Sequence, residues 1–252
     1  MLLGINGAQG TGKSTLADFL KLALETQRGW RVAVLSIDDF YLTRAERAAL
    51  ADQVHPLLRT RGVPGTHDTD LLSRHLDDLR SLAEGEEHRL PRFDKARDDR
   101  MDESQWPLVS GPIELIILEG WCVGSVSQDD TDLNQSINEL ESDKDPTGDW
   151  RAYVNDRLAS DYARLFARLD ALIFLQAPSF DAIYRWRLEQ ERKLAASAPA
   201  GASGIMSESQ IAEFIRYYER ITRSNLRQLP RSADVVLVLD EQHNIVGSRY
   251  RD

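Results

Sequence analysis

The chain has 252 residues, a formal net charge of −10 and a single cysteine, Cys122. This length suits one large α/β domain. The acidic balance disfavours binding to nucleic acid or anionic membranes, and a lone cysteine excludes an intrachain disulfide framework and fits a reducing compartment. No apolar run approaches the length of a membrane span, and the first predicted strand begins at residue 2, which leaves no room for a signal peptide. We therefore expect a cytoplasmic globular protein with a small-molecule partner, without nucleic-acid or membrane partners, and of unpredicted oligomeric state.

The segment Gly7–Ser14 reads Gly-Ala-Gln-Gly-Thr-Gly-Lys-Ser and matches the G-x-x-x-x-G-K-S pattern of a phosphate-binding P-loop. An apolar run at residues 2–5 predicts a buried strand before it, and apolar residues with helical spacing at 16–24 predict a helix after it. Lys13 suits the β- and γ-phosphates of ATP, and the Ser14 hydroxyl suits a Mg²⁺ ligand. The residues predicted to bind ATP are Gly7, Ala8, Gln9, Gly10, Thr11, Gly12, Lys13, Ser14 and Thr15.

The remaining predicted elements alternate along the chain. The predicted strands are apolar runs at residues 31–37, 113–118, 171–175 and 234–239, with an edge strand at 244–250. The predicted helices lie at residues 43–54, 71–82 and 150–169, after Ser179, and at 207–227. This alternation predicts an α/β fold, a P-loop NTPase-type parallel sheet with helices on both faces and a small helical lid. We expect one P-loop kinase domain over residues 1–252, with the lid at about 185–206 and an acidic insertion at about 125–149.

Three carboxylates follow predicted strands. Asp38 and Asp39 come after the second strand, and Glu119 comes after the third. Because ligands gather at the carboxyl ends of parallel strands, we expect these residues beside the P-loop. Glu119 suits a Mg²⁺ ligand, directly or through water, and Asp38 or Asp39 is placed to act as a base toward an attacking hydroxyl. The simpler alternative is that both aspartates cap the loop after the strand.

The predicted helix after Ser179 carries three arginines, Arg185, Arg187 and Arg192. A stretch of small residues follows at 195–204, which favours a lid that closes over the phosphates and supplies an arginine to the transition state. The alternative is a charged, solvent-exposed helix face on which Glu189 and Glu191 form i,i+4 pairs.

Two polar loops, at residues 59–70 and 90–100, are rich in charge and lack helical or strand periodicity. Arginine binds carboxylates bidentately, so these loops predict a site for a small anionic acceptor, to which His67 donates a hydrogen bond. The alternative for His67 is a local bond within its loop.

Between Gln128 and Asp149 the chain has eight acidic residues and one basic residue. The simplest interpretation of this run is a solvated surface insertion. We expect Cys122, which follows the third strand, to be a small buried residue rather than a reactive thiol.

Several segments together resemble the D-glycerate 3-kinase family, which is similar to the uridine kinase, phosphoribulokinase and pantothenate kinase group. They are Ser36–Tyr41 (Ser-Ile-Asp-Asp-Phe-Tyr), Arg61–Asp68 (Arg-Gly-Val-Pro-Gly-Thr-His-Asp), Pro91–Lys95 (Pro-Arg-Phe-Asp-Lys), Ile117–Trp121 (Ile-Leu-Glu-Gly-Trp) and Trp186–Glu191 (Trp-Arg-Leu-Glu-Gln-Glu). The resemblance runs from the P-loop to about Arg227, and its specificity lies in the order and spacing of these segments.

The resemblance implies ATP-dependent phosphorylation of the 3-hydroxyl of D-glycerate. It implies that Asp38 rather than Asp39 is the base, and that the catalytic residues are Lys13, Asp38, Glu119 and Arg187. It also implies acceptor-binding residues among Tyr41, Arg61, His67, Asp68, Arg92, Asp94, Lys95 and Arg100.

Two other functions stay open at this stage. A uridine-type or sugar-phosphate kinase would use aromatic stacking, for which Tyr41, Phe93 and Trp121 are available. A nucleotide-binding regulatory ATPase would need no acceptor base at Asp38.

Overall fold

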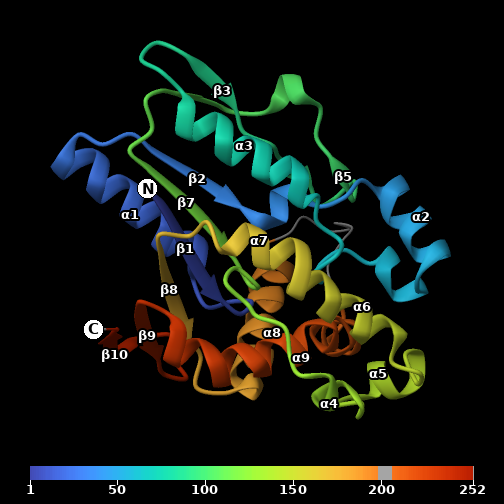
Figure 1. The fold of residues 1–252 in the computed structure, drawn as a ribbon. Helices are drawn as coiled ribbons and strands as arrows, with labels where there is room; N and C mark the ends of the chain where they lie inside the picture. Colours follow the sequence, from blue (N-terminus) through green and yellow to red (C-terminus); the bar gives the residue numbers. More distant parts are fainter. Residues whose placement is uncertain (198–205, 252) are drawn as a thin grey trace.

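The computed structural model describes residues 1–197 and 206–251, and its centre is a six-stranded sheet (Figure 1). The strand order is β10-β9-β8-β1-β7-β2, and β10 is antiparallel to β9 while the other pairs are parallel. The strands span Leu2–Gly7 (β1), Val32–Ser36 (β2), Leu115–Gly120 (β7), Ala171–Gln176 (β8), Val235–Leu239 (β9) and Ile245–Tyr250 (β10). The predicted α/β fold is therefore confirmed, with β10 as the predicted edge strand.

Helices follow the strands in the order that the sequence predicts. They include Lys13–Arg28 (α1), Arg44–Gln53 (α2), Thr69–Ser81 (α3), Asp149–Arg157 (α6), Ala163–Phe166 (α7), Phe180–Ser197 (α8) and Glu208–Ser232 (α9). Short helical turns lie at Ile37–Phe40, Pro56–Arg59 and Glu103–Gln105, and a π-helical turn at Leu158–Tyr162 joins α6 to α7. Two small antiparallel two-stranded sheets pair Glu87–Arg89 (β3) with Leu108–Ser110 (β6), and Phe93–Asp94 (β4) with Asp99–Arg100 (β5). The second is a hairpin that lies in the connection between β3 and β6.

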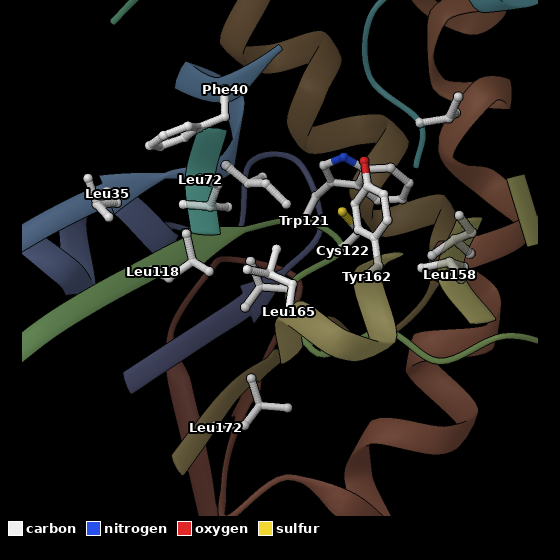
Figure 2. Packing of buried hydrophobic residues seen from close by; sticks show 14 of the residues in the cluster. Leu35, Phe40, Leu72, Leu118, Trp121, Cys122, Leu158, Tyr162, Leu165 and Leu172 are labelled. Atoms are coloured by element: carbon white, nitrogen blue, oxygen red, sulfur yellow. The ribbon is translucent and has the colours of Figure 1, made fainter. Parts of the chain in front are cut away.

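One face of the sheet packs against α3, the α6–α7 segment and part of α9. Side chains of β7 alternate between the faces, so Ile116 and Leu118 point to this side. Leu72 of α3 and Leu165 of α7 belong to the same buried cluster, and Figure 2 shows these side chains with those of the neighbouring strands. Cys122 is fully buried in this cluster, as predicted.

The other face packs against α1 and α8. Ile117 of β7 and Ile5 of β1 point to this side, and Ala17 of α1 packs beside them. Ile183 and Trp186 of α8 complete the cluster. Helices therefore cover both faces, which leaves the carboxyl ends of the strands to carry the polar residues.

The acidic insertion differs from the solvated surface segment that its composition predicts. It forms two short helices, Asp130–Leu133 (α4) and Glu139–Lys144 (α5), and two of its carboxylates are fully buried. Glu141 accepts hydrogen bonds from Arg220 at 2.6 and 2.8 Å, and Asp145 accepts one from Arg151 at 2.9 Å. The prediction is wrong for these two residues because each buried carboxylate has an arginine partner that the local sequence does not reveal.

Two helix ends also differ from the predictions. Helix α9 continues past Arg227 to Ser232 and includes Pro230. A proline in the last turn removes a backbone donor near the helix end, where buried Leu229 still anchors the turn in the core. Helix α8 continues to Ser197, so part of the predicted small-residue stretch is helical. The rest of that stretch, from 198 onward, lies outside the described residues.

Candidate active site

The P-loop connects the end of β1 to the start of α1. Gly10 and Gly12 have φ angles of 81° and 88°, in the left-handed region that glycine adopts readily. A Cβ on Gly7 would lie 2.5 Å from the Thr11 hydroxyl, which itself donates a 2.8 Å hydrogen bond to the Ala8 carbonyl. The glycines are therefore required by the backbone path and by close packing, and the loop curls tightly before the helix begins.

Lys13 is the first residue of α1, and its ammonium reaches back across the loop. Its Nζ donates a 3.1 Å hydrogen bond to the Ala8 carbonyl. Burial lowers the pKa of Lys13, and the carboxylates of Glu119 and Asp38 oppose this shift. This mutual influence indicates that Lys13 and both predicted strand-end carboxylates share one site.

Strand register brings Glu119 to Ser14. Glu119 lies opposite Ile5 of β1 and opposite Ser36 of β2, so it stands between the P-loop strand and the strand that leads to Asp38. The Ser14 hydroxyl donates a 2.9 Å hydrogen bond to Glu119 Oε1. A hydroxyl and a carboxylate at this distance form the oxygen donor set that Mg²⁺ prefers.

The side chain of Asp38 faces cationic and phenolic donors. Lys95 Nζ donates to Asp38 Oδ2 at 2.7 Å, and the Tyr41 hydroxyl donates to Oδ1 at 2.8 Å. Burial opposes ionisation of Asp38, but the Lys95 charge and these hydrogen bonds outweigh it and hold the pKa of the carboxyl below its usual value. Asp38 is therefore an ionised carboxylate near the P-loop lysine.

Asp39 points elsewhere, as adjacent residues in a short helical turn do. It accepts hydrogen bonds of 3.1 Å from Arg92 Nη1 and from the Phe93 backbone N–H. Burial raises the pKa of Asp39, against the effect of Arg92 and of the Phe93 N–H. Asp39 thus anchors the second polar loop, while Asp38 faces Lys95 and Tyr41.

His67 lies buried beneath Tyr41, with the two rings stacked at a centroid distance of 4.5 Å. The Tyr162 hydroxyl accepts a hydrogen bond from the Gly65 N–H at 3.0 Å and lies 2.6 Å from His67 Nδ1. Within the described residues Nδ1 is the acceptor that the Tyr162 hydroxyl proton can reach, so we assign the imidazole proton to Nε2. Burial lowers the pKa of His67 to about 4, so the ring is neutral at pH 7.

The Nε2 atom of His67 is buried and has no hydrogen-bond partner within the described part of the chain. A buried N–H without a partner is costly, and such groups in native proteins often serve a ligand. The coupling of His67 to the Asp38 charge indicates that this donor lies near the predicted base.

The other predicted acceptor-binding residues divide into two groups. Asp68 caps α3 through the Leu71 N–H and accepts a bond from Arg100, and Asp94 accepts bonds from two backbone N–H groups of its own loop. These contacts give Asp68, Asp94 and Arg100 a structural role in holding the loops. Arg61 pairs with Asp98 and lies 5.5 Å from the Phe93 ring centroid, next to the loop that supplies Lys95.

Helix α8 brings Arg187 close to the P-loop. A Cβ on Gly10 would lie 3.2 Å from Trp186 Cβ and 4.0 Å from the Arg187 backbone nitrogen. The Arg187 guanidinium forms an ion pair with Glu191 at 2.6 Å, without the angles of a hydrogen bond, and lies 5.7 Å from the Phe214 ring centroid. The i,i+4 pairing agrees with the alternative interpretation of this helix, but the two side chains are only 13% and 5% exposed, so they do not lie on the solvent-exposed face that this alternative predicts.

The other two arginines of α8 also have acidic partners. Arg185 pairs with Glu241, and Arg192 pairs with Glu208 at 2.6 Å. Of the three arginines, Arg187 has its backbone nitrogen near Gly10 of the phosphate-binding loop.

Sequence reasoning missed Tyr162 and Tyr218 as residues of the site, and it considered Trp121 for aromatic stacking but not as a hydrogen-bond donor. Trp121 Nε1 donates to the Gly62 carbonyl at 3.0 Å, and a Cβ on Gly62 would lie 2.3 Å from the Tyr218 hydroxyl. Their spacing follows helix and strand periodicity and is typical of core residues. The available signal is the pair of glycines Gly62 and Gly65: both have positive φ, and an added Cβ would meet Tyr218 at Gly62 and Tyr153 at Gly65.

The fold and this site define a P-loop kinase. A glycine-rich loop and Lys13 face a Ser14–Glu119 pair, and an ionised Asp38 lies at the end of the adjacent strand. Among the described residues, no helix combines the length and hydrophobicity needed to cross a membrane.

Comparisons with known proteins agree with this class. The chain is 38% identical over 224 residues to the uncharacterized kinase mug58 of Schizosaccharomyces pombe, covering 86% of this chain and 78% of that protein. It is 31% identical over 262 residues to the chloroplastic D-glycerate 3-kinase of Arabidopsis thaliana, covering 97% of this chain and 53% of that protein, so it spans about half of that relative's length. No family model matches the chain.

The fold comparison extends over the whole chain. The solved structure of a D-glycerate 3-kinase from Cryptococcus neoformans matches with a TM-score of 0.82 and 27% identity, covering 100% of this chain and 89% of that one. The chain therefore belongs to the family of P-loop kinases that includes the D-glycerate 3-kinases. It is an ATP-dependent phosphotransferase that acts on a hydroxyl group of a small molecule, and the alternatives of a nucleoside kinase and a regulatory ATPase are not favoured.

Proposed function

We propose that this kinase transfers the γ-phosphate of ATP to the 3-hydroxyl of D-glycerate, with Mg²⁺ as the metal cofactor. The observation that carries the proposal is that an ionised Asp38 lies near a neutral His67 whose buried Nε2–H has no hydrogen-bond partner within the described residues. The two cationic loops lie beside them. A base suits the attacking hydroxyl, and a buried donor with nearby cations suits a carboxylate-bearing acceptor. Two relatives that bear the name D-glycerate 3-kinase support the choice of acceptor.

On the donor side, residues 7–15 would hold the triphosphate through backbone N–H groups and the positive end of α1. Lys13 would leave the Ala8 carbonyl and bind the β- and γ-phosphates. Ser14 and Glu119 fit Mg²⁺ because their oxygens already lie 2.9 Å apart. When bound, the cation neutralises charge on the β- and γ-phosphates.

On the acceptor side, Asp38 would accept the proton of the 3-hydroxyl as the hydroxyl oxygen bonds to the γ-phosphorus, while the bond from that phosphorus to the bridging β-phosphate oxygen breaks and ADP leaves. The hydroxyl must first replace Tyr41 or Lys95 as a donor to Asp38. The Lys95 side chain is 59% exposed, so loosening its ion pair with Asp38 costs little free energy. The low pKa of Asp38 keeps the carboxyl in its ionised form, which is the form that can accept that proton.

Recognition of the acceptor's carboxylate would fall to His67 and to cations of the two polar loops. The Nε2–H of His67 would donate to an acceptor oxygen and thereby satisfy a buried group. Lys95 and Arg61 come from loops that contact each other, since Arg61 Nη2 lies 3.3 Å from the Lys95 carbonyl. Tyr41 and Arg92 hold this arrangement through Asp38 and Asp39.

Arg187 would supply a positive charge to the transferring phosphate. Its backbone lies against Gly10 of the P-loop, so exchanging Glu191 for a phosphate oxygen requires a rotation of the side chain rather than a movement of the helix. The predicted lid at about 185–206 stays part of this proposal; its described part is mainly α8, and residues 198–205 lie outside the described residues.

The remaining parts of the proposal concern partners and location. The acidic charge and the buried, free Cys122 support a cytoplasmic enzyme without a nucleic-acid or membrane partner. The whole chain would act as one kinase domain, since the α1 and α8 contacts extend from the P-loop strand to the lid helix.

The acceptor is tested by coupled ADP release with D-glycerate, L-glycerate, pantothenate, ribulose 5-phosphate and uridine in parallel. We expect turnover with D-glycerate and a product whose phosphorus signal is that of 3-phosphoglycerate. Turnover with uridine but not with glycerate would overturn the acceptor assignment. Formation of 2-phosphoglycerate would overturn the assignment of the 3-hydroxyl.

A further inference from the structure

Three metal-ligating side chains converge where α3 meets β3. His75 and Asp78 are three residues apart on α3 and therefore share one face of the helix, and His88 comes from β3, the next strand in the chain. One ligand atom from each side chain lies within 4.8 Å of the other two. His75 Nδ1 and His88 Nε2 are only 2.7 Å apart.

The elements that carry these ligands are held in place by contacts of their own. His75 is buried, with its ring at the edges of Phe40 and Trp106 at centroid distances of 5.9 and 5.8 Å. Leu72, Leu76 and Leu79 anchor α3 in the core on both sides of His75. His88 lies opposite Val109 in the β3–β6 sheet, so its backbone position is set by strand pairing.

The cluster opens to solvent on one side. Asp78 and His88 line a surface depression of about 430 Å³ together with Glu86 and Glu87. The carboxylates make this depression favourable for a cation, and it leaves room for a water molecule as a further ligand.

We propose that His75, Asp78 and His88 bind one divalent transition-metal ion, with Zn²⁺ as the best match. Two imidazoles and one carboxylate, with water in the fourth position, form a zinc donor set, whereas Mg²⁺ prefers oxygen ligands. Zn–N bonds of about 2.0–2.1 Å place two tetrahedral nitrogens about 3.3 Å apart, so the two rings need to separate by only about 0.6 Å.

The position of this site gives the ion a structural consequence. The ion would tie α3 to strand β3, and the chain runs from β3 directly into the polar loop that carries Arg92 and Lys95. Asp68, the N-cap residue of α3, accepts a hydrogen bond from Arg100 at the other end of that loop. A bound ion would therefore restrain both ends of a loop that contacts Asp38 and Asp39.

The test is calorimetric titration of Zn²⁺ into the full-length protein in excess Mg²⁺. We expect one equivalent of Zn²⁺ to bind, and we expect His88→Gln and Asp78→Asn to weaken binding by about tenfold or more. Both side chains are at least partly exposed, so these variants should fold, which circular dichroism checks. Co²⁺ in place of Zn²⁺ should give the intense visible absorption of a four-coordinate ion in the wild type and lose it in His88→Gln.

Two control variants separate this site from other sources of binding. Asp77→Asn changes the neighbouring exposed aspartate, which pairs with Arg168, and Glu119→Gln removes a carboxylate beside the P-loop. Both should retain wild-type affinity for Zn²⁺. The proposal fails if the wild type binds no Zn²⁺. It also fails if Glu119→Gln abolishes Zn²⁺ binding while His88→Gln does not. In either case His75 and His88 would form only an imidazole–imidazole hydrogen bond.

Discussion

Replacement of Asp38 by asparagine removes the predicted base but keeps a side chain that can bond to Lys95 and Tyr41. Asparagine keeps the size of the side chain and its carbonyl oxygen, so it continues to accept a hydrogen bond from Lys95 or Tyr41. It cannot accept the proton of an attacking hydroxyl. General-base catalysis contributes a factor of about 10²–10⁴, so we expect kcat to fall by that factor, equivalent to about 3–5 kcal/mol of activation free energy.

The same replacement should leave the fold almost unchanged. The ion pair that it weakens involves a Lys95 side chain that is 59% exposed, and exposed ion pairs contribute about 0–1 kcal/mol. For a chain of this size, such a loss lowers Tm by no more than about 2–4 °C. The affinity for ATP should also change little, since the side-chain hydrogen bonds of Asp38 within the described residues involve Tyr41 and Lys95 rather than the P-loop.

The matched control is Asp39→Asn. Asp39 holds Arg92 and the Phe93 N–H, so its loss should loosen the polar loop and raise KM for the acceptor, with kcat within about tenfold of the wild type. Coupled ADP release at saturating ATP, with the acceptor varied, measures both constants. A lower kcat for Asp39→Asn than for Asp38→Asn, or a kcat within threefold of wild type for Asp38→Asn, would refute the assignment of the base.

Three further predictions follow from the same structure. Glu119→Gln keeps an oxygen that accepts from the Ser14 hydroxyl but loses the negative charge, so the Mg²⁺ concentration for half-maximal activity should rise about tenfold. An unchanged Mg²⁺ titration would argue against Glu119 as a Mg²⁺ ligand. Gly65→Ala and Gly85→Ala share the strain of positive φ, about 1–2 kcal/mol, but a Cβ on Gly65 would also lie 2.5 Å from the Tyr153 ring. We expect Gly65→Ala to lose about 1–3 kcal/mol more in thermal unfolding, and equal losses would contradict the packing argument. The folded-state pKa of His67, about 4, lies below its unfolded value of 6.5, so the unfolded state binds more protons between these pH values. The free energy of unfolding should therefore fall by up to about 3 kcal/mol as pH decreases from 6.5 to 4, and denaturant titrations of His67→Gln should lack this share of the decrease.

The donor half of the site follows from short-range chemistry. The Gly7–Ser14 pattern predicts a P-loop between a strand and a helix, and the structure has this loop, with positive φ at Gly10 and Gly12 and α1 beginning at Lys13. The apolar runs predict β2 and β7 to within two residues at their carboxyl ends, since β7 continues through Glu119 to Gly120, and parallel register then brings Glu119 to the P-loop edge. These features are predictable because each depends on a few neighbouring residues or on the alignment of parallel strands.

The acceptor half depends on contacts between distant segments. Asp38 meets Lys95, which is 57 residues away, and His67 meets Tyr162, which is 95 residues away. The spacing around Asp68 and Arg100 predicts charge in the loops but not that these residues bond to each other. The buried ion pair between Glu141 and Arg220 could not be predicted for the same reason. Its partners are 79 residues apart, and Glu141 belongs to an acidic run whose composition predicts exposure to solvent.

The sequence alone therefore determined the nucleotide-binding loop, the alternating strands and helices, and the strand-end positions of Asp38 and Glu119. The tertiary structure decided which aspartate faces Lys95, which nitrogen of His67 lacks a partner, and which charged residues hold loops instead of facing the site. The physical reason is that periodicity and turn chemistry act over a few residues. The partner and the burial of a polar side chain, by contrast, depend on how α3, the small two-stranded sheets and α9 pack against the central sheet.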